Sequence, residues 1–291
     1  AHSRGLKLGL HTVPGTHDCG RDKVGGFGNE DVHINQFIEW DVDLIKLDKC
    51  RLESGWNEEL LKETYLKWKR LLRERGSKIV MSISAYEIRD WYPEVGQMAR
   101  TTADISSIKH RGANFSETHQ GFYPIALENV KASAYAQPGF WNDPDMLVTG
   151  NQGLTYEEEK THFALWCIMS APLMLGNDPR ISTQKELDII TNKKAIAVNQ
   201  TGQGQGKKLL SKGAIDVWHK VLSDESSALL FVNTGDSPED FNIQFEEIGL
   251  PERVRMYDIY NNVKLGWVEQ AYSSALDPHA CLFFITKYSG K

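Results

Sequence analysis

Two carboxylates in this chain of 291 residues lie where short apolar runs end, which is where parallel sheets present ligand-binding groups. Asp48 follows Lys46 by two residues, so on an extended strand both side chains project to one face. A neighbouring ammonium favours an ionised carboxylate and lowers its pKa, and such a carboxylate can attack an electrophilic sugar carbon. An ion pair at the strand end without catalytic duty is the alternative interpretation.

Asp104, in a later apolar run, would need the opposite property. A general acid must hold its proton near neutral pH, which a partly desolvated position beside another carboxylate can achieve. Two carboxyl groups about 5 to 5.5 Å apart across a glycosidic bond would give a retaining glycosidase that works through a covalent glycosyl ester.

The segment Trp141-Asn142-Asp143-Pro144-Asp145-Met146 is unusually polar for a strand. Its proline would delete a hydrogen-bond donor from a sheet, so a turn capped by aspartates is one interpretation. The other is a sugar-binding segment, because an aromatic ring beside fixed carboxylates holds a pyranose by stacking and hydroxyl hydrogen bonds.

Apolar runs, loops and amphipathic stretches alternate from residue 7 to about 178, which predicts parallel strands joined by crossover helices. The predicted strands are six: 6–13, 44–47, 78–83, 102–105, 146–148 and 171–175. A helix over 57–75 carries an apolar stripe at steps of four, three and four, formed by Leu61, Tyr65, Trp68 and Leu72. Thr155 with Glu158 and Thr183 with Glu186 predict two more helix starts through capping boxes.

The pattern changes after residue 203, where long helical stripes give way to short β-rich runs bounded by turn residues. We therefore expect two domains, a catalytic one over 1–203 and an antiparallel β domain over 204–291. Its predicted strands are 217–221, 228–232, 241–245, 255–260 and 282–285.

Composition excludes several classes of protein. With 41% apolar residues, 25% charged residues and a net charge of −6, the chain resembles an ordinary soluble protein and not a nucleic-acid binder. The apolar stretch 164–175 is shorter than the ~20 residues of a membrane span. The four cysteines lack CxxC spacing, which argues against structural zinc. A Cys19–Cys50 bridge is a hypothesis that would imply an oxidising compartment.

Five ordered segments resemble glycoside hydrolase family 27, the α-galactosidases and α-N-acetylgalactosaminidases. They are KLGLHTVPG with HDCG, FIEWDVDLIKLDKC, RTTADI, GFWNDPDMLVTGNQGLT, and ALWCIMSAPLMLGNDPR with AIAVNQ. The resemblance implies a (β/α)8 barrel followed by a β-sandwich, with Asp48 as nucleophile and Asp104 as acid/base. It also implies a Cys19–Cys50 disulfide. The sugar-contacting residues that we expect are Lys46, Arg100, Asp145, Met146, His11, Ser84, Ala85 and Trp141.

Three departures from the family pattern stand out. No DDxW-like segment occurs, the matching strands are the third to the eighth, and we expect the parent protein to have an N-terminal portion outside this chain. His11 stands where a tyrosine is usual. Ser84 or Ala85, depending on a one-residue shift, occupies a place near the sugar 2-position, and a small residue there favours a bulkier substituent.

We therefore expect a retaining exo-α-glycosidase that removes terminal galactose-like sugars from an oligosaccharide or glycoconjugate. It needs no cofactor or metal and binds neither nucleic acid nor membrane, and we expect a secreted or otherwise extracytoplasmic location. A homo-oligomer is left open. The alternatives are a non-catalytic or vestigial carbohydrate-binding protein and a transglycosylase of the same chemistry.

Overall fold

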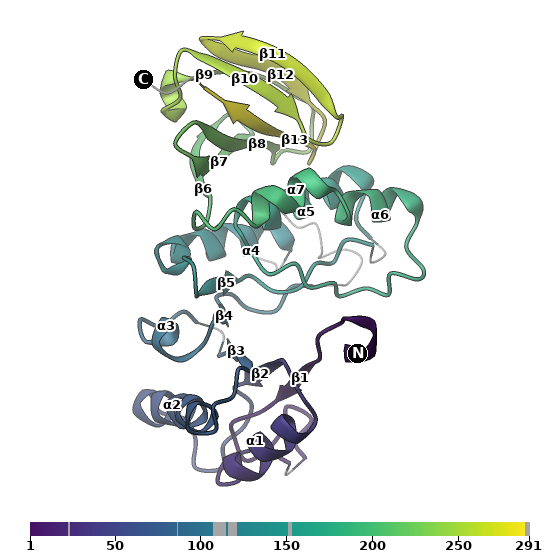
Figure 1. Ribbon diagram of the computed structural model, residues 1–291. Coiled ribbons are helices and arrows are strands. Elements are labelled where there is room, and N and C mark those ends of the chain that lie inside the picture. Colours follow the sequence, from purple (N-terminus) through teal and green to yellow (C-terminus); the bar gives the residue numbers. More distant parts are fainter. Residues whose placement is uncertain (23, 86, 107–114, 116–120, 151–152, 289–291) are drawn as a thin grey trace. The chain divides into compact units, whose positions relative to one another are not determined.

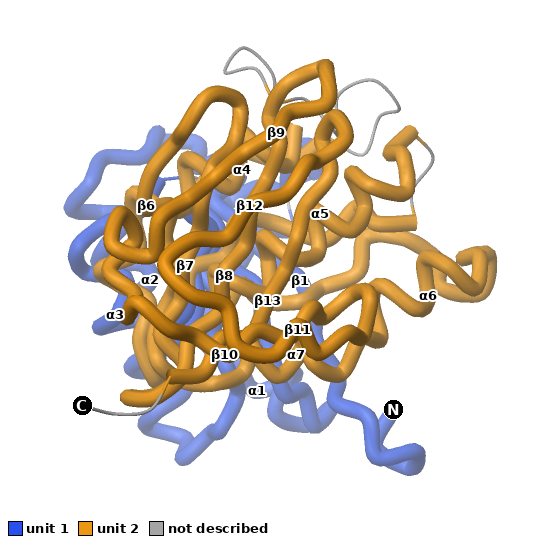
Figure 2. Tube along the Cα trace, turned by 90° about the horizontal axis from the view of Figure 1, so that it is seen from above, with its two compact units in different colours: residues 1–101, 139–141 blue, residues 102–138, 142–291 orange. Residues whose placement is uncertain are grey.

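The structure is a computed structural model that describes residues 1–291 except 23, 86, 107–114, 116–120, 151–152 and 289–291. Its chain forms two compact units, coloured separately in Figure 2. The first contains residues 1–101 and 139–141, and the second contains 102–138 and 142–291.

The first unit is built on parallel strands that follow one another in chain order (Figure 1). They are β1 (Gly9–Thr12), β2 (Leu44–Asp48), β3 (Val80–Ser84) and β4 (Met98–Arg100), and β5 (Trp141–Asp143), which begins in this unit, comes next in the sheet order. The helices between them are α1 (Glu30–Glu39), α2 (Glu58–Glu74) and α3 (Tyr92–Val95), and a short 3-10 helix η1 (His2–Arg4) precedes β1. Neighbouring strands that are also consecutive in the chain are the winding of a (β/α)8 barrel, as the sequence predicted.

Helix α2 confirms the stripe that the sequence predicted. Asn57 caps it by accepting a hydrogen bond from the Leu60 amide at 2.8 Å. The four residues of the stripe are all buried, and Trp68 is fully enclosed. A side chain at Gly26 would meet the Trp68 ring at 2.6 Å, so this glycine is required for the ring to pack. The helix ends before Gly76, whose φ of 62° is left-handed.

Three of the six predicted strands are wrong in position or extent. The strand predicted at 102–105 lies at 98–100, and the one predicted at 146–148 lies at 141–143. The runs predicted at 146–148 and 171–175 pair in the parallel sense as predicted, but only through one isolated bridge between Leu147 and Leu175. The observed strands were missed because their buried residues include polar ones, such as Arg100 and Asn142, and apolar runs therefore point to the wrong segments.

The second unit begins with helices. They are α4 (Phe122–Asn129), α5 (Tyr156–Ile168), α6 (Gln184–Ile190) and α7 (Lys193–Asn199), with a 3-10 helix η2 (Val130–Tyr135) after α4. Both predicted capping boxes are present, at Thr155 with Glu158 and at Thr183 with Glu186. Helix α5 packs on α4, α6 and α7 and also on strands of the β domain, so ten of its thirteen residues are buried.

The β domain is a sandwich of one large and one small antiparallel sheet (Figure 1). The large sheet has the order β11-β10-β13-β8-β7-β6, the small one pairs β12 with β9, and the 3-10 helix η3 (Glu246–Ile248) follows β9. The strands are β6 (Lys207–Lys212), β7 (Ile215–Ser223), β8 (Ser226–Asn233), β9 (Glu239–Gln244), β10 (Arg253–Asp258), β11 (Val263–Glu269), β12 (Ala271–Leu276) and β13 (Cys281–Lys287). All five predicted strands are confirmed, whereas β6, β11 and β12 were missed. Aromatic rings fill the space between the sheets, with Phe231 stacked on Phe241 at 5.2 Å. Among the described residues, no helix combines the length and apolar character needed to cross a bilayer.

Candidate active site

The sheet of the first unit has one apolar and one polar face. Ile45, Leu47 and Ile83 alternate onto the apolar face and are completely buried. On the opposite face the register aligns His11 with Lys46 and aligns Asp48 with Ser84. Because aligned residues of parallel strands share a face, four predicted site residues come together at the carboxyl ends of β1, β2 and β3.

Asp48 is held as a carboxylate by its neighbours on this face. Burial alone would raise its pKa, but the hydrogen bond from His11 and the charge of Lys46 outweigh burial and leave the pKa below its ordinary value. The His11 Nε2 and Asp48 Oδ2 atoms are 3.2 Å apart. The prediction that Lys46 favours the ionised form is confirmed, although His11 contributes more.

The second oxygen of this carboxylate is enclosed without a geometrically good donor. Asp48 Oδ1 is buried and accepts no hydrogen bond of normal geometry from a described residue, although the nearby Ser84 hydroxyl also lowers the pKa. Leaving a buried carboxylate oxygen without a donor costs free energy. A nucleophile requires such an oxygen, because its lone pairs must be available to the reacting carbon.

Backbone contacts fix the end of β2. The buried Tyr65 hydroxyl on α2 donates to the Leu47 carbonyl at 2.9 Å, and the Trp56 indole donates to the Cys50 carbonyl at 2.8 Å. The Lys49 amide donates to the Ser84 carbonyl at 2.7 Å. The sequence did not indicate Tyr65 and Trp56 as positioning residues. The available signal was the tyrosine within an otherwise apolar stripe, since a buried hydroxyl needs a partner.

The predicted disulfide between Cys19 and Cys50 is present, with 5.1 Å between the Cα atoms. It ties the loop after β1 to the residue two positions beyond Asp48. The candidate ligand atoms of Cys19, Asp48 and Cys50 lie within 4.8 Å of one another, a grouping that resembles a metal site. Both thiols are consumed by the disulfide, so this group lacks the thiolates that a metal would need.

In the second unit, Asp145 organises the loop that carries Asp104. Its Oδ2 accepts from the Ile105 amide at 2.9 Å, and its Oδ1 accepts from the Met146 amide at 2.7 Å. The Thr102 hydroxyl donates to the Pro144 carbonyl at 3.0 Å. Asp104 is exposed between these two anchor points. Asp145 has a φ of 100°, a strained conformation for a residue with a side chain, which points to a functional constraint.

The remaining predicted residues occupy defined places. Met146 is half-buried against Gly176, where an added Cβ would lie 2.4 Å from the Met146 sulfur. Arg100 ends β4 and is 2% exposed, while Trp141 begins β5 and is half-buried.

Ala85 is buried one position beyond Ser84, and its carbonyl accepts from Arg89 at 3.3 Å. The register thus settles that Ser84, not Ala85, shares the face of Asp48.

Two family models match the chain. One, described as alpha galactosidase A, covers residues 1–201, and the other, the alpha galactosidase C-terminal beta sandwich domain, covers residues 212–286. The chain belongs to the α-galactosidase family. Among the relatives of this family member are alpha-galactosidase 2 of Arabidopsis thaliana and the alpha-galactosidase of Cyamopsis tetragonoloba, both 33% identical to it. The alignments cover 97% and 98% of this chain and 69% and 67% of those relatives.

Solved structures of the family agree with the fold. A candidate α-galactosidase/melibiase from Bacteroides fragilis is 34% identical, with a TM-score of 0.88 over 98% of this chain. Alpha-galactosidase I from Mortierella vinacea, at 24% identity, matches in fold with a TM-score of 0.89 over the whole of this chain and 79% of its own length. The chain spans about two thirds of the length of the two plant relatives and 63% of the Bacteroides chain.

The disulfide beside Asp48 predicts a loss of stability on removal. Replacing Cys19 and Cys50 together by serine frees a loop of sequence separation 31, which lowers the free energy of unfolding by roughly 3–4 kcal/mol. Urea unfolding followed by circular dichroism measures the change. Reduction with dithiothreitol serves as the matched control, because it should destabilise the native chain by a similar amount and leave the double variant unchanged. Equal stability of the two chains under oxidising conditions would contradict a structural role.

The His11 contact predicts a shift in the ionisation of Asp48. In His11→Ala the bond that lowers the Asp48 pKa is lost while burial remains, so the pKa rises and the carboxylate takes up its proton at a higher pH. Titration of the Asp48 carboxyl carbon by NMR measures the shift. His2→Ala is the control, since His2 hydrogen-bonds Asp43 at the opposite end of β2. An unchanged titration of Asp48 in His11→Ala refutes the assignment.

Proposed function

We propose that this member of the α-galactosidase family is a retaining exo-α-glycosidase that hydrolyses terminal α-galactosyl residues of oligosaccharides or glycoconjugates. The observation that supports it best is the state of Asp48, an ionised carboxylate with one buried oxygen that lacks a good donor. Its place at the carboxyl end of a barrel strand is where this fold carries catalytic groups. The plant relatives at 31–33% identity are named α-galactosidases, which supports the sugar.

In the proposed mechanism, Asp48 attacks the anomeric carbon and forms a covalent glycosyl ester, while Asp104 gives its proton to the departing glycosidic oxygen. Asp104 then takes a proton from water, which attacks the ester and releases the sugar with its original configuration. Asp104 is exposed, which differs from the partly desolvated position that the sequence predicted for the general acid. Lys46, Arg100 and Trp141 are proposed to bind the sugar with Asp145, and Met146 to line its pocket.

Residues 1–203 are the proposed catalytic domain and residues 204–291 the accessory β domain. The disulfide supports a secreted or otherwise extracytoplasmic location, because such bonds persist in oxidising compartments. The small side chain of Ser84, which shares the face of Asp48, is proposed to leave room for a substituent larger than hydroxyl at the sugar 2-position. Comparing aryl α-galactoside with aryl α-N-acetylgalactosaminide tests this specificity.

Two other functions remain as alternatives. A carbohydrate-binding protein without catalysis would bind the sugar and release no product from any aryl glycoside. A transglycosylase would transfer the sugar to an acceptor hydroxyl in place of water, which analysis of products formed with an acceptor sugar detects. The strained backbone at Asp145 and the lowered pKa of Asp48 favour a catalyst over a simple binding protein.

The roles of the two aspartates predict different rescue products. Asp48→Ala should lower turnover of an aryl α-galactoside at least ~10³-fold, and added azide, taking the place of the nucleophile, should yield the β-galactosyl azide. In Asp104→Ala, ester formation should stay fast for substrates whose leaving group departs without protonation. Asp48 still forms the ester, so added azide should attack it and yield the α-galactosyl azide. NMR of the products measures both outcomes.

Asp188→Ala on the exposed surface of α6 is the control and should keep native turnover. Retained turnover in Asp48→Ala, or the same azide anomer from both variants, defeats the assignment of roles. A third outcome is native turnover in the control, no turnover in the two variants and no azide product from either. That outcome would keep the two aspartates as essential for catalysis but refute the double-displacement mechanism.

A further inference from the structure

A row of side chains crosses one face of the large sheet in the β domain. The register aligns Trp267 on β11 with Arg255 on β10, Arg255 with Lys287 on β13, and Lys287 with Ser226 on β8. Directly opposed residues in antiparallel strands have Cβ atoms roughly 4.5–5.5 Å apart on the same face. The row therefore places an indole ring, two cations and a hydroxyl side by side.

This row lines a shallow hollow with a volume of about 270 Å³. Its lining is completed by Ser223, Glu225 and Tyr288. The hollow is slightly smaller than the ~300 Å³ at which pockets for drug-sized ligands begin, so it suits a single small ring.

The two cations of the row have no anionic partner in the described part of the chain. Arg255 and Lys287 face each other on neighbouring strands, and like charges in this arrangement repel. Among the described residues, neither forms an ion pair with Glu225 or with any other carboxylate. Arg253, by contrast, pairs with Glu269 at 3.3 Å. The hollow thus offers two positive charges to a negatively charged ligand.

The tryptophan gives the hollow its preference for a ring. Trp267 is 44% exposed, and the Arg253 guanidinium lies 4.5 Å from the centre of its ring and holds it in place. An exposed indole stacks on the C–H face of a sugar. Serine hydroxyls and the Glu225 carboxylate line the same hollow and supply partners for sugar hydroxyls.

We propose that this hollow binds an anionic sugar, a pyranose that carries a carboxylate or a sulfate group. Arg255 offers its planar guanidinium for paired hydrogen bonds to the acidic group, and Lys287 adds a point charge. Trp267 stacks on the ring. The site would hold the β domain on an acidic polysaccharide, and it does not depend on the proposed catalysis.

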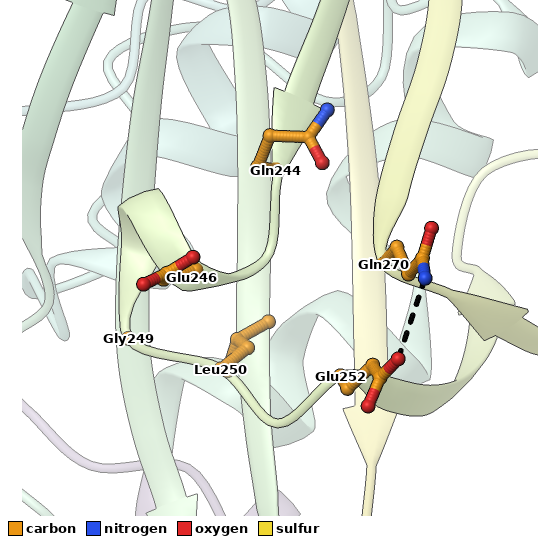
Figure 3. A pocket seen from close by; sticks show the side chains of 6 residues that line it. All are labelled: Gln244, Glu246, Gly249, Leu250, Glu252 and Gln270. Atoms are coloured by element: carbon orange, nitrogen blue, oxygen red, sulfur yellow. Dashed lines mark hydrogen bonds between the residues drawn. The ribbon is translucent and has the colours of Figure 1, made fainter.

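A second and larger hollow in the same domain, of about 610 Å³, lacks these features (Figure 3). Carboxylates and amides line it, and Gln270 donates to Glu252 at 3.4 Å within it. Its lining includes neither an aromatic ring nor a cation: Gln244, Glu246, Gly249, Leu250, Glu252 and Gln270. It therefore offers no group that selects an acidic sugar.

Isothermal titration calorimetry of the full chain tests the proposal with trigalacturonate and galactose 6-sulfate as acidic probes and β-1,4-galactotriose as the neutral one. We expect at least one acidic probe to bind, with affinity that falls as salt rises, and the neutral probe to bind about tenfold more weakly or not at all. Whichever acidic probe binds more tightly identifies the carboxylate or the sulfate as the preferred group.

Two variants address the two halves of the site. Trp267→Ala removes the ring and Arg255→Gln with Lys287→Gln removes the charges, and each should weaken acidic binding about tenfold or more. Trp40→Ala is the matched control, because Trp40 is also an exposed tryptophan, at 55%, but lies at the end of α1. It should bind as the native chain does. Circular dichroism establishes that each variant is folded.

Several outcomes would overturn the proposal. They are the absence of binding for both acidic probes, equal affinity for the neutral probe, and undiminished binding in either variant of the hollow. Equal affinity for inorganic phosphate would also overturn it, since a simple anion site needs no sugar ring. Turnover of an aryl α-galactoside by Trp267→Ala, compared with the native chain, keeps this result separate from the catalytic proposal.

Discussion

The proposed chemistry of this chain depends on keeping one half-buried carboxylate, that of Asp48, charged. Burial raises the pKa of Asp48, whereas the hydrogen bond from His11 on β1 and the charge of Lys46 on β2 lower it. A one-residue slip of either strand would send these side chains to the helix-covered face. The apolar residues of the same strands prevent such a slip, because Ile45 and Leu47 are fully buried on the opposite face. Packing of the core and ionisation of the site are thus two consequences of a single register.

The position of this carboxylate is fixed mostly by a covalent bond and by contacts to the main chain. The disulfide at Cys50, the Tyr65 hydroxyl on Leu47 and the Lys49 amide on the Ser84 carbonyl all act on the main chain around Asp48. None of them consumes the side-chain oxygens that a nucleophile needs. These main-chain contacts restrain the position of the carboxylate, and of the side chains around it His11 binds Oδ2 and leaves Oδ1 without a donor of good geometry.

Local signals in the sequence were sufficient for some elements and misleading for others. The stripe of α2 and the two capping boxes depend on residues within one or two turns, so they could be predicted. Strands β4 and β5 could not, because they bury polar residues, Arg100, Asn142 and Asp143, and the hydrogen bonds of Asn142 and Asp143 reach Ala132, Gln205 and Asp145 outside the strand. Strand β11 was missed because it is an edge strand whose residues are largely exposed.

The same contrast holds at the site. Asp48 and Lys46 share a face by simple alternation along one strand, so their pairing could be predicted. The contact of His11 with Asp48, and the choice of Ser84 over Ala85, depend on how separate strands align. The two amides held by Asp145 depend on a left-handed backbone that few non-glycine residues adopt. Such features are properties of the assembled fold and leave little trace in composition or spacing.

Within the second unit, the β domain is connected to the loop of Asp104 through one helix. Helix α5 packs on β7, β8 and β13, and its Glu158 is hydrogen-bonded to His279 of the β domain at 3.0 Å. Further along α5, the Trp166 indole donates to the Asp145 carbonyl at 2.8 Å, and Asp145 holds the Ile105 amide. The β domain is therefore part of the support for the loop that carries Asp104. A substitution that weakens the packing of the sandwich on α5 should therefore also weaken the hold on this loop, through the contacts of Trp166 with Asp145 and of Asp145 with Ile105.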